Sequence, residues 1–231
     1  KITCLIEQEK RMCLSYETYA NGACWWDWPR WETELDFMAM NGVNMPLCLI
    51  GYEAVWYYTM LKLNVNREDA LGFLSGVCYY PLQLEGKLDS FLQLVDTDFL
   101  KARAELGKKI LERAAELGMT PVMQGFNGHV PKYLKGYFKK IELTPVTQFC
   151  KFANTFRVLQ TDPLFEKIGA ALYEKQKELF GTAKYYICDP FSAVEPMVRG
   201  DVFLKNYGGA LYSLLDKYAD GAVWVLDAAS Y

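Results

Sequence analysis

The sequence predicts an α/β fold, a (β/α)-barrel (TIM-barrel-like) of which about five strand–helix units are present in a single domain, residues 1–231. Helical and strand-like patterns alternate along the chain, which favours parallel strands joined by helical crossovers. No glycine-rich phosphate loop follows a strand, which argues against a doubly wound nucleotide-binding sheet. Polar and aromatic residues follow the strand-like segments, as they do where the strands of a barrel enzyme end.

Composition limits the classes of partner. Hydrophobic residues make up 52% of the chain and the formal net charge is -3, so we expect a folded core and no nucleic-acid partner. Charged residues interrupt every apolar run, and therefore no membrane span is expected. The seven cysteines form no Cys-x-x-Cys pair. From this pattern we expect no metal site, and nothing else in the sequence indicates a cofactor.

Four segments have the apolar spacing and the end signals of amphipathic helices. Asp27 and Asp162 are suited to cap the first and the third, and glycines follow three of the four segments. A shorter helix is expected to begin at EAVWYY, with Glu53 in its first turn. The four long predicted helices span about 27–41, 99–117, 162–180 and 201–219.

Short apolar runs between these helices are predicted to be the strands. They are RMCLSYETY, VNMPLCLIG, MTPVMQGF, KYYICDPF and AVWVLDA. Consecutive strands should lie parallel and adjacent. Because functional residues of a barrel follow its strands, Gly51, His129, Asp189 and Asp227 are expected near one common end.

Four tryptophans lie close together, at positions 25, 26, 28 and 31. Such a cluster is able to stack on a sugar ring. At helical spacing it is more often part of a core, and we expect it to pack against the sheet from outside.

Several long strings are similar, in order and spacing, to the α-N-acetylglucosaminidase family, which is glycoside hydrolase family 89. They are CWWDWPRWETELDFMAMNGVNMPL, GYEAVW, ELGMTPVMQGFNGHVP, DPLFEKIGAALYEKQKELFGT, DPFSAVEP and AVWVL. The resemblance covers nearly the whole chain and implies the N-terminal part of a catalytic TIM-barrel domain. It implies retaining hydrolysis of terminal α-linked N-acetylglucosamine, and a lysosomal, periplasmic or secreted location.

The resemblance also marks a departure at the catalytic position. A retaining glycosidase needs two carboxyl groups about 5–5.5 Å apart, one as acid/base and one as nucleophile. In this family the acid/base glutamate follows an Asp-x-Phe-Asn or Asp-x-Phe-His sequence, and the matching position is Ala193. Glu195 is the nearest carboxylate, but two extended residues shift a side chain by about 6–7 Å, so it is a weak candidate. The resemblance places the nucleophile beyond Tyr231, so no intact catalytic pair is expected here.

Four side chains are candidates for substrate binding: Glu53, His129, Asp189 and Asp227. His129, the only histidine, lies in the FNGHVP turn and is expected either to fix that loop or to contact a ligand. Glu53 is expected to cap the helix that begins at EAVWYY rather than to bind a sugar. Asp189 is expected mainly to accept a hydrogen bond at the end of a strand. Positions that line the sugar pocket in the family read Ser15, Glu17, Asn21, Ser192 and Ala229 in this chain.

Three functions remain open at this point. In the first, the chain is an excised piece of an active α-N-acetylglucosaminidase. In the second, it is a glycan-binding or protein-binding pseudoenzyme. In the third, it is a purely structural domain. The resemblance implies an N-acetylglucosamine-containing glycan as partner. Since a closed barrel has eight strands, we also expect the remaining barrel segment, or another subunit, to cover the edge after residue 231.

Overall fold

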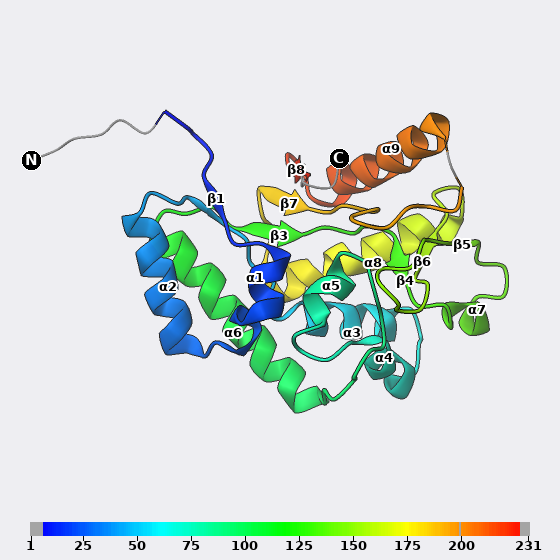
Figure 1. Ribbon diagram of the computed structural model, residues 1–231, viewed down its shortest axis with the longest axis horizontal. Coiled ribbons are helices and arrows are strands. Elements are labelled where there is room, and N and C mark those ends of the chain that lie inside the picture. Colours follow the sequence, from blue (N-terminus) through cyan, green and yellow to red (C-terminus); the bar gives the residue numbers. More distant parts are fainter. Residues whose placement is uncertain (1–6, 199, 227–231) are drawn as a thin grey trace, which may run out of the picture.

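Five short parallel strands run through the centre of the fold in the order β1, β2, β3, β7 and β8 (Figure 1). The computed structural model describes residues 7–198 and 200–226. The parallel strands are β1 (Met12–Cys13), β2 (Met45–Pro46), β3 (Val122–Gln124), β7 (Tyr185–Ile187) and β8 (Val223–Val225). A parallel bridge between Leu47 and Val122 joins the first pair of strands to the other three. The predicted order and direction of the strands are therefore confirmed.

The four long predicted helices are confirmed as α2 (Trp28–Met40), α6 (Thr97–Glu116), α8 (Pro163–Phe180) and α9 (Asp201–Tyr218). The side chains of Asp27 and Asp162 accept hydrogen bonds from the first-turn amides of α2 and α8, as their sequence pattern indicates. Glycine caps α8 at Gly181. Shorter helices fill the connections: α1 (Tyr16–Asn21), the 3-10 helix η1 (Ala23–Trp25), α3 (Tyr52–Lys62), α4 (Arg67–Phe73), α5 (Tyr80–Leu84) and α7 (Leu134–Tyr137).

A second, antiparallel sheet is inserted between β3 and α8. It consists of β4 (His129–Val130), β5 (Leu143–Pro145) and β6 (Phe156–Val158) in the order β4-β6-β5. Figure 1 shows this inserted sheet beside α7, at the opposite end of the molecule from α2. The parallel strands are equally short, but they lie in longer apolar runs. Polar residues flank or interrupt β4, β5 and β6, which explains why the sequence did not reveal the inserted sheet.

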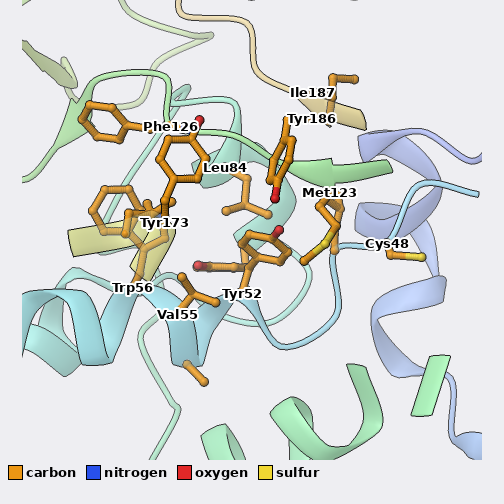
Figure 2. Close-up of a cluster of buried hydrophobic side chains, with 14 of the residues drawn as sticks. Cys48, Tyr52, Val55, Trp56, Leu84, Met123, Phe126, Tyr173, Tyr186 and Ile187 are labelled. Carbon is orange, nitrogen blue, oxygen red and sulfur yellow. The ribbon is translucent and has the colours of Figure 1, made fainter. Parts of the chain in front are cut away.

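The core lies between the parallel strands and the helices packed on them. Figure 2 shows one part of it, in which Tyr52 and Trp56 from α3 meet Tyr173 from α8 and Tyr186 from β7. Several of these tyrosines also use their hydroxyl groups. The Tyr173 hydroxyl accepts a hydrogen bond from the Phe126 backbone amide at 3.1 Å, and the Tyr52 hydroxyl accepts one from the Gln124 backbone amide at 3.0 Å. Buried phenols thus satisfy backbone groups where the short strands end.

Two expectations need correction. The predicted first strand extends only over Met12–Cys13, because Ser15 and Thr18 form a reciprocal capping box that starts helix α1 at Tyr16. The tryptophan cluster is only partly core. Trp31 is fully buried, whereas Trp25 is 66% exposed because it ends η1, before the apolar stripe of α2 begins.

In the described part of the chain, no helix has the length and apolar character to cross a membrane. No group of three or more metal-ligating side chains is found among the same residues.

Candidate functional site

The loops that follow β3 and β7 meet the end of α5, and we refer to this region as the mouth. Gln124, at the end of β3, accepts a hydrogen bond from the Tyr16 hydroxyl and donates its own amide to the Leu84 carbonyl at 3.4 Å. Asn127 donates to the same carbonyl at 2.8 Å. The residue after Leu84 is therefore held beside the carboxyl end of β3.

That residue is Glu85, and its carboxylate is buried at the mouth. Its Oε1 accepts hydrogen bonds from Lys87 Nζ at 2.7 Å and from Ser192 Oγ at 3.1 Å. Only 4% of Glu85 is exposed, and burial raises the pKa of its carboxyl above the usual range, although Lys87 opposes the rise. The bond from Ser192 connects Glu85 to the loop after β7, at the residue before Ala193.

A fully buried arginine holds the two loops that carry Glu85 and Ser192. Arg157, from β6, donates to the Pro190 carbonyl at 2.9 Å and to the Gly86 carbonyl at 3.1 Å. The Thr155 hydroxyl donates to Gly86 as well, at 2.6 Å. Burial lowers the pKa of Arg157 to about 10, which still leaves it charged at neutral pH. The inserted sheet is thus part of the framework of the mouth.

Gly86 is the point at which this framework is tightest. Its φ is +74°, a conformation that disfavours side chains, and a Cβ added there would lie 2.3 Å from Arg157 Nη2. No other residue type fits between Glu85 and Lys87 without displacing Arg157.

His129 lies in the same region and is buried. One ring nitrogen, Nδ1, is 3.2 Å from the Gln83 carbonyl, and Nε2 is 3.4 Å from Asp89 Oδ2. Burial lowers the pKa of His129, and the Asp89 carboxylate only partly opposes this. The ring also packs on Phe73 at 5.5 Å between centroids. Both ring nitrogens face partners in segment 83–89, so the ring joins the FNGHVP turn to another loop rather than fixing its own loop alone.

The backbone at Ala193 is in the left-handed region, with φ +52°, which is unusual for a residue other than glycine. Strained backbone of this kind is concentrated at functional positions. Glu195 is exposed, and its backbone amide donates to Thr147 Oγ1 at 2.7 Å. The segment after β7 is thereby attached to the inserted sheet.

The remaining sequence candidates lie in different surroundings. Asp189 is buried after β7, and its Oδ1 accepts the Phe191 amide at 3.1 Å, as expected for a strand-end acceptor. Glu53 accepts the Gly51 amide at 3.1 Å and faces Arg103 at 3.4 Å. The contact with Gly51 caps the start of α3, as predicted. The contact with Arg103 is a buried ion pair with a residue of α6. Asp227 lies outside the described residues.

Glu85 and Lys87 were not among the sequence candidates. Their segment, LQLEGKLD, follows no predicted strand and belongs to none of the strings that resemble the family. A charged pair flanking a glycine is the only local signal, and it is common on surfaces. Tertiary contacts with Ser192 and Arg157 bring the pair to the mouth.

Grooves on the outer helices are less suited to chemistry. One of about 320 Å³ lies between α8 and α9, beside the solvent-exposed pair formed by Glu166 and Lys217. It lies away from the strand ends and their buried carboxylates, so the mouth is the better candidate for a functional site.

Parallel strands with helical crossovers, and polar side chains gathered where the strands end, define a barrel-type α/β domain of the kind that carries enzyme sites. The family model for the alpha-N-acetylglucosaminidase (NAGLU) TIM-barrel domain matches residues 11–229. The chain belongs to this family.

Relatives support the same assignment. Human α-N-acetylglucosaminidase is 29% identical over 206 residues, which cover 87% of this chain and 28% of the human protein. A family 89 glycoside hydrolase from Clostridium perfringens, solved with 2-acetamido-1,2-dideoxynojirmycin, has a TM-score of 0.90 and 30% identity, covering 95% of this chain and 25% of its own. The same enzyme has been solved in substituted form with its substrate GlcNAc-alpha-1,4-galactose, with equal similarity. The chain thus spans about a quarter of the length of these relatives.

Proposed function

We propose that this chain forms a glycan-recognising part of an α-N-acetylglucosaminidase-like barrel and does not itself catalyse hydrolysis. The observation that carries the proposal is Ala193, because the resemblance to the family aligns this residue with the acid/base position. A methyl group transfers no proton, and a retaining mechanism requires a proton donor.

The buried polar framework at the strand ends supports recognition over a purely structural role. Arg157 and Thr155 fix the Gly86 and Pro190 carbonyls, and Ala193 has a left-handed backbone. A domain without a ligand has no evident need for buried charges at the strand ends, because such charges are costly. The ligand class is a glycan with a terminal N-acetylhexosamine, as for the relative solved with GlcNAc-alpha-1,4-galactose.

The open edge of the sheet suggests where the rest of the barrel is added. Val223, on β8, and Val202, on α9, are 42% and 74% exposed. Further strand–helix units, from the remainder of the protein or from another subunit, are proposed to cover this edge. The coverage of the relatives, about a quarter of their length, is consistent with such an arrangement.

The test is a turnover assay with an aryl α-N-acetylglucosaminide. The purified chain is expected to release no p-nitrophenol above a heat-treated control across about pH 4–8, the range in which carboxyl catalysts operate. Release that disappears in Glu195→Gln would overturn the proposal and make Glu195 the acid. A parallel ligand-detected NMR titration with N-acetylglucosamine tests recognition. We expect weak but detectable binding, with a Kd weaker than about 1 mM, or less than roughly 4 kcal/mol of binding. The absence of any detectable binding would overturn the glycan-recognising function.

A further inference from the structure

A small internal cavity lies where α3, α5 and α6 meet, beside Leu49 and Ile50 of the segment that follows β2. Its volume is about 10 Å³. Apolar side chains form most of its walls, and three polar residues complete them: Glu53 from α3, Tyr80 from α5 and Arg103 from α6. These three residues are only 1%, 2% and 8% exposed. A cavity of this size has room for one water molecule and for no larger ligand.

Two hydrogen-bond donors at this cavity have no acceptor. The Tyr80 hydroxyl and Arg103 Nε are both buried and have no hydrogen-bond partner among the residues that the structure describes. The other two guanidinium nitrogens are used, because Nη1 donates to the Cys24 carbonyl at 2.8 Å and Nη2 donates to Glu53 Oε1 at 3.4 Å. Buried polar groups are almost always hydrogen-bonded, since a donor without an acceptor destabilises the fold. Two such donors in the wall of one cavity indicate a shared acceptor inside it.

The electrostatic surroundings of Tyr80 place the three polar groups close together. Burial raises the pKa of the Tyr80 phenol well above its usual range. The Glu53 carboxylate adds to this rise and the Arg103 guanidinium opposes it, so both charged groups lie near the hydroxyl. The phenol therefore keeps its proton at neutral pH and is available as a donor.

We propose that this cavity binds one internal water molecule, held by Tyr80, Arg103 and Glu53. The water oxygen accepts hydrogen bonds from the Tyr80 hydroxyl and from Arg103 Nε, and one of its hydrogens is donated to the Glu53 carboxylate. The surroundings select a neutral ligand, because an anion would face Glu53 and a cation would face Arg103. This inference goes beyond the proposed function and holds whether or not the chain binds a glycan.

The water connects three helices that are distant in the sequence. Tyr80 is the first residue of α5, and Leu84 at the other end accepts hydrogen bonds from Gln124 and Asn127 at the mouth. The helix α5 is thus held at its start by the water and at its end by residues from β3 and the loop after it. With the water bound, every nitrogen of the buried Arg103 guanidinium has an acceptor.

The direct test is a high-resolution crystal structure of the protein. We expect an ordered water within about 3.2 Å of both the Tyr80 hydroxyl oxygen and Arg103 Nε. A cavity without a water, or direct hydrogen bonds from both donors to protein groups, would overturn the proposal.

Tyr80→Phe gives an independent test in solution, because the sign of its effect depends on the water. With the water bound, the variant loses a satisfied hydrogen bond, and the midpoint of urea unfolding should fall by roughly 0.2–0.6 M. Without the water, the substitution removes a buried hydroxyl that has no partner, and the midpoint stays the same or rises. Either of these last two results overturns the proposal.

Two other tyrosines provide the controls for this measurement. The Tyr207 hydroxyl donates directly to the Val158 carbonyl at 3.1 Å, so Tyr207→Phe should lower the midpoint as Tyr80→Phe does. Tyr212 is 52% exposed on α9, and Tyr212→Phe should leave the midpoint unchanged.

Discussion

The helical layer around the parallel strands and the mouth at their ends are stabilised in different ways. The helical layer is held by apolar packing: Phe165 of α8 meets Phe126 and Tyr207 at 5.5 Å between ring centroids in both cases. The mouth instead buries Glu85, Lys87 and Arg157. Glu85 and Arg157 have polar partners from distant segments, and Lys87 pairs with Glu85. Burial of apolar surface is tolerant and non-directional, whereas buried charges require specific partners. The mouth is therefore the region in which a functional constraint is visible.

Truncation in the helical layer should give the largest loss of stability. Phe165→Ala removes a ring that is 3% exposed and packs on two other aromatic rings. We expect a loss of about 3–5 kcal/mol in the free energy of unfolding, measured by urea titration. Tyr212→Ala, on the exposed face of α9, is the control and should change stability by less than about 0.5 kcal/mol. Similar losses for both variants would contradict the packing described for α8.

At the mouth, Arg157→Met should lower the free energy of unfolding by less than Phe165→Ala does. Its effect should be confined to the loops that Arg157 holds. The change leaves the Pro190 carbonyl without its donor and weakens the hold on Gly86, so a loss of about 2–3 kcal/mol is expected. Faster proteolysis in the 84–92 loop should accompany it, because this loop loses its attachment to β6. Arg67→Met, which removes an exposed arginine, should leave both stability and proteolysis unchanged. A stable, protease-resistant Arg157→Met would show that the buried charge is dispensable to the framework.

His129 tests the buried environment of the mouth through the pH dependence of folding stability. Burial lowers its folded pKa below the unfolded value of about 6.5, so its contribution to stability is present above that value and is lost as the pH falls through the folded pKa. His129→Gln should flatten this acid-side loss, at a cost of about 1–2 kcal/mol at neutral pH. Because His129 is the only histidine, its imidazole NMR signal gives the folded pKa directly. A pKa at or above 6.5 would contradict the buried, neutral ring.

The contribution of Glu85 to stability should depend on pH in the opposite direction to that of His129, and by a smaller amount. Its folded pKa is raised, so the stability that it contributes is fully present below the unfolded pKa and is lost as the pH rises through the folded pKa. Between about pH 4.5 and the folded pKa, wild type should lose stability relative to Glu85→Gln. The measurement is a series of urea titrations at stepped pH, with Glu142→Gln as control. Parallel pH curves for wild type and Glu85→Gln would argue that Glu85 is better solvated than its burial indicates.

Local signals in the sequence were sufficient for the regular parts of the fold. Asp27 and Asp162 caps, glycine stops and apolar spacing placed α2 and α8, and the alternation of patterns gave parallel, adjacent strands. The family was also recognisable from sequence, and the match over residues 11–229 confirms it. The loss of the acid at Ala193 remains a prediction from that resemblance.

Only the tertiary structure decided what the mouth contains. Glu85 and Ser192 are separated by more than a hundred residues, and Arg157 reaches both of their loops from an inserted sheet with no sequence signal of its own. Capping and periodicity act over a few residues and can be read from sequence, because their partners are neighbours in the chain. A buried ion pair depends on which distant loops converge, and that is set by packing of the whole domain.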